Sequence, residues 1–279
     1  MFKAVGVLAT IALFLILTGC GSSTSNRVVY NSIPSPLPDN VASEGPEAYG
    51  FSELGDGFTL AATRGTLTQV TVVLDSWACQ NGAWYSGDCV TTPGTTFSQP
   101  ITVNIYGVTQ TNGVWAPSST TPLASITKTF DIPYRPTSTP AQCGSDNQVW
   151  YSSKDQKCYH GIAMPVTVDF SSSQLPIPAP ANIIVTVAYN TTSYGPSPIG
   201  PSATCYGTPA GCPYDSLNIA TYGDGGLIGA VLDPNSIFVN YTIAANACNP
   251  SSTTTGVLAL DAGCWTGYHP EITVRAVTP

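Results

Sequence analysis

Cysteine is the residue type with the clearest chemical potential in this chain, which holds nine cysteines and only two histidines. Eight of the cysteines fall into four local couples separated by long cysteine-free stretches: Cys79 with Cys89, Cys143 with Cys158, Cys205 with Cys212, and Cys248 with Cys264. An even number of cysteines grouped in this way favours complete disulfide pairing in an oxidising compartment. Eight cysteines allow about a hundred pairings, and the local grouping predicts the four couples just named.

Metal binding is the alternative use of clustered cysteines. No two cysteines have the C-x-x-C spacing of a zinc site, and the two histidines, His160 and His269, are too few to complete one. Two acidic glycine turns, Gly55-Asp56-Gly57 and residues 223–226, have oxygen ligands that Ca²⁺ accepts, but Asp-Gly is more simply a turn signal. We therefore expect no metal ligand set and no cofactor.

Hydrolysis would require a histidine between a nucleophile and a carboxylate, as in a Ser-His-Asp triad. Neither His160 nor His269 lies in a recognisable catalytic motif. A pair of carboxylates for glycoside cleavage remains an alternative, although the chain has only four glutamates: Glu44, Glu47, Glu53 and Glu271. The sequence favours a protein that binds rather than catalyses, with no catalytic residue assigned.

Aromatic side chains in the disulfide loops offer a binding chemistry. Flat rings stack on the apolar faces of sugars, and two of the cysteine couples each enclose a Trp-Tyr-Ser tripeptide. The candidate ligand-binding residues are Trp84, Tyr85, Trp150, Tyr151 and Trp265. They predict a glycan or another envelope polymer as the ligand. The alternative is that these rings are buried over the disulfides, because tryptophan is highly buried on average.

The ninth cysteine, Cys20, closes the run Leu17-Thr18-Gly19-Cys20 behind a short apolar segment, residues 4–17, with Lys3 before it. That segment has the length of a signal-peptide core and is shorter than the roughly 20 residues that span a bilayer. These residues resemble the lipobox of bacterial lipoproteins. The resemblance implies cleavage before Cys20, attachment of lipid to its thiol, and anchorage in a membrane.

The lipobox resemblance also implies a domain division and a location. Residues 1–19 would be the signal peptide, and residues 20–46, rich in Ser and then Pro, would be a lipidated tether. Residues 47–279 would form a single domain. Gly21 stands where the enterobacterial members of this family carry the aspartate that retains them in the inner membrane, so an outer-membrane or cell-surface location is expected.

Composition excludes several classes of function. The formal net charge is −8 at pH 7 and only 9% of residues are charged, so the chain repels phosphate backbones and nucleic-acid binding is not expected. The 26 glycines and 24 prolines disfavour long helices and supply turns. This composition is typical of an exported all-β protein, and the oligomeric state stays open.

Alternating apolar and polar residues predict the strands. Alternation is clear at residues 70–74, 101–106, 125–130, 166–170, 183–189, 237–241 and 272–276, and weaker at 58–63. Eight or more antiparallel strands joined by turn-rich loops predict a two-sheet sandwich, with a jelly-roll-like topology expected.

Several further runs resemble a class of uncharacterised exported bacterial β-sandwich surface proteins. They are Phe51-Ser52-Glu53-Leu54-Gly55-Asp56, Ser76-Trp77-Ala78-Cys79, Pro100-Ile101-Thr102-Val103-Asn104-Ile105-Tyr106 and Ala188-Tyr189-Asn190-Thr191. The resemblance implies export and a β-sandwich and brings no activity with it. The sequence therefore predicts a lipid-anchored envelope protein of the binding type, with a structural or adhesive role, or hydrolysis, as alternatives.

Overall fold

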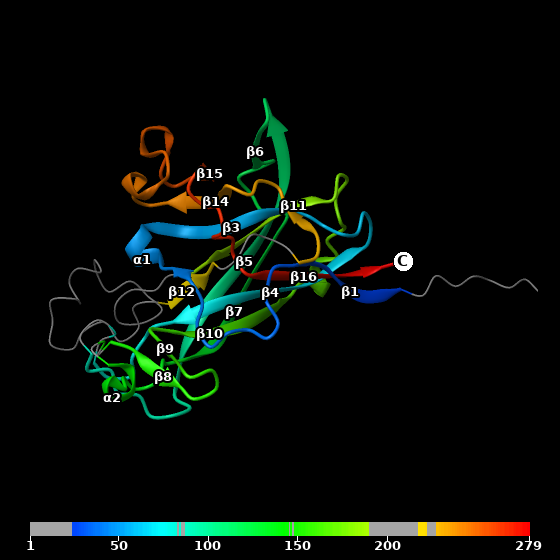
Figure 1. Ribbon diagram of the computed structural model, residues 1–279. Coiled ribbons are helices and arrows are strands. Elements are labelled where there is room, and N and C mark those ends of the chain that lie inside the picture. Colours follow the sequence, from blue (N-terminus) through cyan, green and yellow to red (C-terminus); the bar gives the residue numbers. More distant parts are fainter. Residues whose placement is uncertain are drawn as a thin grey trace, which may run out of the picture.

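The computed structural model describes residues 24–82, 84, 87–144, 146, 148–189, 217–221 and 227–279 (Figure 1). Nearly all regular structure in these residues is β-strand, and every strand pairing is antiparallel. Two main sheets contain most of the strands, so the prediction of an all-β chain with two antiparallel sheets is confirmed.

The smaller main sheet has six strands, and the larger has eight. The smaller, sheet A, runs in the order β1 (Ser25–Asn31), β16 (Ile272–Thr278), β4 (Thr66–Ser76), β12 (Leu217–Ala220) and β2 (Ser43–Glu44), with β10 (Ile162–Asp169) also paired to β4. The larger, sheet B, runs in the order β15 (Leu258–Ala262), β14 (Ser236–Tyr241), β3 (Phe51–Thr59), β11 (Asn182–Ala188), β5 (Thr96–Thr111) and β6 (Val114–Pro117), with β13 (Ala230–Val231) on β3 and β7 (Ala124–Pro133) on β5. A separate pair is β8 (Trp150–Ser152) with β9 (Lys157–Tyr159).

Helices are short in the described residues. They are the single turns α1 (Pro46–Tyr49) and α2 (Pro140–Cys143) and the 3₁₀ turns Ser171–Ser173, Ala244–Asn246 and Pro250–Ser252. Among these residues no helix has the length and apolar character needed to cross a membrane.

One apolar core lies between the two sheets, and the alternation of side chains along each strand explains it. On β4, Val70, Val72 and Leu74 point into the core, while Val73 points to the opposite face of sheet A. On the facing sheet, β5 and β11 place Ile105 opposite Val185, and both are fully buried. The period-two pattern in the sequence therefore predicted the buried faces correctly.

The outer face of sheet A is covered by residues 33–42, which we call the strap. Ile33, Leu37 and Val41 in the strap pack against Val73 and Ala220 on the sheet. Main-chain hydrogen bonds hold both sides of the strap: Ala163 donates to the carbonyl of Asp39 at 2.8 Å, and Thr221 donates to that of Ala42 at 2.7 Å.

The strap and β1 correct the sequence-based prediction of a tether over residues 20–46. Residues 25–31 pair with β16, and Val29 and Tyr30 are buried in the core. The proline-rich composition predicted an extended spacer. In the structure, the apolar residues among these prolines pack against the outer face of sheet A. Only residues 21–24 separate Cys20 from β1.

Three of the four predicted disulfides are present: Cys79–Cys89, Cys143–Cys158 and Cys248–Cys264. The fourth predicted couple, Cys205 with Cys212, lies outside the described residues, as does Cys20. Each closed loop spans 10 to 16 residues and joins segments outside the central strands. In the chain-entropy model, loops of this size stabilise the fold by about 2–3 kcal/mol each.

Candidate functional site

A candidate binding site lies on the outer face of sheet B, on the side away from the core. Three large side chains on this face, Tyr106 of β5, Ile184 of β11 and Phe238 of β14, form a second apolar cluster. Because β3, β11, β5 and β14 are neighbours in the sheet, residues distant in sequence share this surface. Tyr106 forms the floor of the cavity described next, and Ile184 and Phe238 pack with Tyr106 without lining the cavity.

Two elements rise beside this floor and turn it into a groove. The hairpin formed by β5 and β6 supplies Trp115 on one side, and β15 supplies Leu258 and Leu260 on the other. The groove has a volume of about 670 Å³, within the roughly 300–1,000 Å³ of small-molecule sites. Serine and threonine residues at 118–120 line its rim. We call this cavity the β6–β15 groove.

Glu53 of β3 brings a carboxylate to the β6–β15 groove. Its side chain is only 8% exposed. Its Oε1 accepts hydrogen bonds from Asn104 Nδ2 at 2.7 Å, from Tyr106 Oη at 3.0 Å and from the hydroxyl of Thr186. All three donors are neutral. Among the described residues no cation forms an ion pair with Glu53.

The electrostatics of the groove favour hydroxyl-rich or cationic ligands over anions. Burial raises the pKa of Tyr106 well above its usual range, and the charge of Glu53 raises it further, so the phenol keeps its proton. The groove thus combines an aromatic wall, a held carboxylate and hydroxyl groups. None of the described residues that line it is basic, so none would attract a phosphate or a carboxylate.

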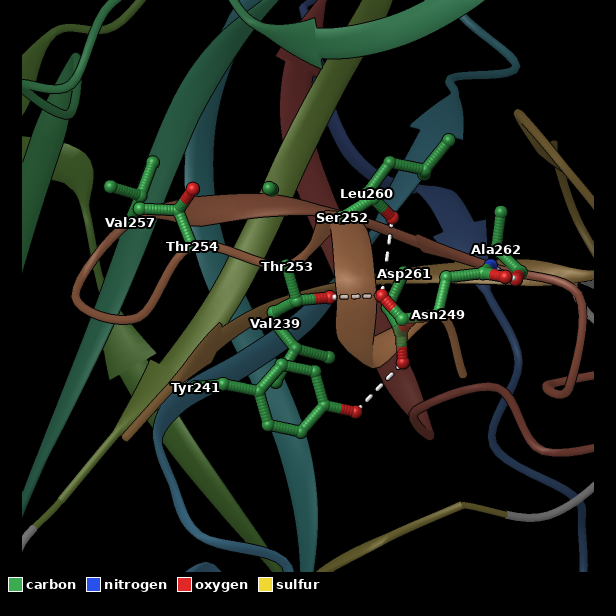
Figure 2. A pocket seen from close by; sticks show the side chains of 11 residues that line it. Val239, Tyr241, Asn249, Ser252, Thr253, Thr254, Val257, Leu260, Asp261 and Ala262 are labelled. Atoms are coloured by element: carbon green, nitrogen blue, oxygen red, sulfur yellow. Dashed lines mark hydrogen bonds between the residues drawn. The ribbon is translucent and has the colours of Figure 1, made fainter. Parts of the chain in front are cut away.

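A smaller pocket of about 260 Å³ lies on the other side of β15 (Figure 2). Tyr241 and Asp261 face one another beneath the short turn that carries Ser252 and Thr253 (Figure 2). Both carboxylate oxygens of Asp261 are used in structural hydrogen bonds. They accept from Tyr241 Oη at 2.7 Å, from Trp265 Nε1 at 2.9 Å and from the Cys248 amide at 3.0 Å.

Asp261 also lies within 4.8 Å of the sulfurs of Cys248 and Cys264, a grouping that would suit a metal. The two sulfurs are bonded to each other, so neither is available as a thiolate ligand. The hydrogen bonds and the disulfide around this pocket therefore stabilise the end of sheet B.

Two of the predicted ligand-binding aromatics are buried, which corrects their proposed role. Trp150 is 7% exposed and donates from Nε1 to the carbonyl of Gly161 at 2.8 Å. Trp265 is also 7% exposed and donates to Asp261. Each ring packs beside its disulfide loop and anchors it by one hydrogen bond, so neither presents a face to a ligand.

The other predicted aromatics do not join the first two on one surface. Trp84 is half-buried, with its ring edge against Trp77 at 5.0 Å between centroids, and Tyr151 is partly exposed. Tyr85 lies outside the described residues. Figure 1 places β8, β9 and α2 at one end of the molecule and β14, β15 and β6 at the other. Trp265 donates to Asp261 of β15, whereas Trp150 belongs to β8, so the two tryptophans belong to opposite ends.

The histidines occupy structural positions. His269 is 1% exposed; its Nδ1 lies 2.7 Å from Asp56 Oδ2, and its Nε2 donates to the carbonyl of Pro234 at 3.1 Å. Burial acts to lower the pKa of His269, but the bond to Asp56 and its charge raise it overall. Because both ring nitrogens are engaged, no nucleophile contacts this histidine.

His160 does not form a triad either. It stacks on Trp77 at 5.1 Å between centroids, and its Nε2 lies 3.8 Å from Asp146. Asp56 lies within strand β3 and bonds His269, so the turn that the Asp-Gly sequence indicated at Gly55-Asp56-Gly57 is wrong. The second acidic glycine turn, residues 223–226, lies outside the described residues.

Two buried carboxyl groups, Asp75 and Glu271, and the half-buried Glu44 stand apart from the groove. Burial raises the pKa of Asp75 to about 7 against the opposing bonds from Trp77 and Ser43. Burial also raises the pKa of Glu271 to about 7, with a further contribution from the charge of Asp75. The pKa of Glu44 likewise rises to about 7 through burial. In the folded protein all three groups therefore keep their protons up to about pH 7.

These shifts predict a protein that is more stable in mild acid than in base. Between about pH 4 and pH 7 the folded state binds more protons than the unfolded state, so the free energy of unfolding falls as pH rises and then levels off. We expect Tm to drop by about 5–10 °C between pH 5 and pH 8 in buffer free of divalent cations. Scanning calorimetry across this range checks the prediction; a Tm that is flat or rises with pH would contradict it.

The sequence analysis named Glu53 without assigning it to a site and did not single out Trp115. The available signal was the long strand, 16 residues from Thr96 to Thr111, followed by a turn and a tryptophan. No protein-family model matches this chain, and neither a curated protein nor a solved structure is significantly similar to it.

Proposed function

We propose that this protein is an exported bacterial lipoprotein that binds a glycan or related envelope polymer, without catalysis, in the β6–β15 groove. The single observation that carries the proposal is the groove itself: Trp115 on one wall and Glu53 on the floor. Pyranose rings offer an apolar C–H face and hydroxyl donors together, and this wall and floor match both.

Location follows from the segment before the domain. The lipobox-like run ending at Cys20 supports lipid attachment there, and the three disulfides fit a compartment outside the cytoplasm. We place the protein at the outer membrane or cell surface. Since β1 begins at Ser25, the anchored domain would lie close to the membrane rather than on a long spacer.

The finer topology is part of the same proposal. Consecutive strands pass repeatedly from one sheet to the other, as β3 to β4, β4 to β5 and β15 to β16 do. This alternation supports a jelly-roll-like sandwich, an architecture that lectin domains use. We also propose that Cys205 pairs with Cys212, which would complete the use of the eight cysteines of the domain.

Two other functions are weaker. A structural or adhesive role would need no groove of this size. A hydrolase would need a nucleophile beside His160 or His269, and the partners described above, Asp146, Asp56 and Pro234, include none.

The test is retention of envelope material by the purified mature protein. Polysaccharide and peptidoglycan fractions from the host are immobilised, and binding is measured with and without soluble competitor. The proposal expects saturable binding to at least one fraction and no release of reducing sugar. Absence of retention on every fraction would overturn the binding function, and release of sugar would restore the hydrolase alternative.

A further inference from the structure

The strap covers two carboxylates on the outer face of sheet A. Val73 donates its amide to the carbonyl of Glu271 at 3.0 Å, so Glu271 lies beside Val73, and Asp75 follows two residues later on the same face of β4. Side chains in this diagonal arrangement are within reach of one another. The electrostatic effect of Asp75 on Glu271 agrees with that placement. Both side chains are buried, at 0% and 1% exposed.

Most of the oxygen atoms of this pair have no partner. Asp75 Oδ2 accepts from Trp77 Nε1 at 2.7 Å and from Ser43 Oγ at 3.0 Å. In contrast, Asp75 Oδ1 and both carboxylate oxygens of Glu271 are buried without a hydrogen bond. Buried polar atoms in folded proteins are nearly always satisfied by protein, water or an ion, so these three oxygens require an explanation.

The strap contributes another unsatisfied oxygen, the buried Oδ1 of Asn40. The contacts of Asp39 and Val41, the residues on either side of Asn40, place this part of the strap above β4. Asp39 is bonded through its carbonyl to Ala163, which pairs with Asp75, and Val41 packs on Val73. The strap therefore crosses β4 on its way from β10 to β12, and Asn40 lies within this crossing, next to the strand that carries Asp75.

No protein cation neutralises the pair within the described residues. Lys154, which approaches the strap, binds Asp39 Oδ1 at 2.8 Å. The other groups that face Asp75 are the neutral Trp77 and Ser43, and Asn218 donates to Ser43 rather than to a carboxylate. Without a counter-charge, two adjacent buried carboxyl groups are neutralised by protons in mild acid, and at higher pH a cation from outside the chain is needed to compensate their charge.

We propose that Asp75, Glu271 and Asn40 form a Ca²⁺ site beneath the strap. Carboxylate and amide oxygens are the ligands that Ca²⁺ prefers, and this set contains neither nitrogen nor sulfur ligands that would favour zinc. A divalent cation neutralises both carboxylates and uses the oxygens that lack partners. It also fastens the strap, and hence the segment that leads to Cys20, to sheet A.

The test is thermal unfolding of the mature full-length protein in EDTA and in 5 mM CaCl₂. For a site with the affinity of extracellular calcium modules, we expect Tm to rise by about 3–8 °C with Ca²⁺. Glu271→Gln keeps the side-chain shape and removes a ligand charge. It should fold, with a Tm in EDTA at least equal to that of the unaltered protein, and should lose the Ca²⁺-dependent rise. Asp131→Asn, at an exposed carboxylate on β7, should retain it.

A second readout reports the place of binding directly. Tb³⁺ replaces Ca²⁺ at oxygen sites and emits when a nearby excited indole transfers energy to it. Trp77 bonds Asp75, so excitation of tryptophan should give Tb³⁺ emission that Ca²⁺ displaces and that Trp77→Phe reduces severalfold. The proposal is overturned if Ca²⁺ leaves Tm unchanged in the unaltered protein, or if Glu271→Gln keeps the full shift and the full emission.

Discussion

Replacing His269 with alanine is expected to lower the free energy of unfolding by about 3–5 kcal/mol, one of the two largest effects expected of a single substitution in this protein. The cause is the carboxylate left behind. Asp56 is 1% exposed, and its Oδ2 would lose its only strong partner while its Oδ1 keeps the amide of Gly57. The carbonyl of Pro234 would lose its donor as well. Urea unfolding followed by fluorescence measures the change.

His160→Ala is the matched control for this substitution. His160 is partly exposed and stacks on Trp77 without a strong hydrogen bond, so its loss should cost less than about 1 kcal/mol. Equal costs for the two variants would show that the His269–Asp56 pair does not secure the segment before β16 to β3. Asp56→Asn, which removes the charge but keeps the shape, should fall between the two.

Trp115→Ala is expected to weaken binding of the envelope glycan by about 30-fold, equivalent to about 2 kcal/mol, while leaving Tm within a few degrees. Trp115 forms one wall of the β6–β15 groove and sits on a hairpin that projects from the sheet, so its removal strips the stacking surface without opening the main core. Isothermal titration with the retained polysaccharide fraction gives both affinity and stoichiometry.

Trp84→Ala is the control for binding by the aromatic residues of the disulfide loops. Trp84 lies in the Cys79–Cys89 loop and packs against Trp77, far from β6 in the fold. If the glycan binds in the β6–β15 groove, the Trp84→Ala variant should bind it with unchanged affinity. A loss on Trp84→Ala with no loss on Trp115→Ala would transfer the binding site to the disulfide loops. Glu53→Gln should weaken binding by about tenfold, because the amide still accepts the bond from Tyr106 but no longer carries charge.

The regular strands were predictable from sequence because each has one face in the core. Residues 70–74, 101–106, 183–189 and 272–276 place an apolar residue at every second position, and all four runs became strands with that face in the core. The local cysteine couples were predictable for a related reason: short loops bring their ends together whatever the sheet order is. The three described couples confirm this.

The remaining features depend on contacts between distant segments. The strap has a spacer-like composition, and only its packing against Val73 and Ala220 makes it part of the domain. Trp150 and Trp265 were predicted to lie at a binding surface. Instead both are buried, and their indole N–H groups donate to the carbonyl of Gly161 and to Asp261. Glu53 and Trp115 line the same groove because of the way the strands pair, and sequence spacing does not reveal this pairing.

The most direct measurement of the proposed binding site is amide hydrogen exchange of the mature protein with and without the retained glycan. The β6–β15 groove predicts slowed exchange in residues 106–120 and 256–260, with no change in the loops closed by Cys79–Cys89 and Cys143–Cys158. Protection confined to those two loops, or protection absent from residues 106–120 at saturating glycan, would contradict the assignment of the groove as the binding site.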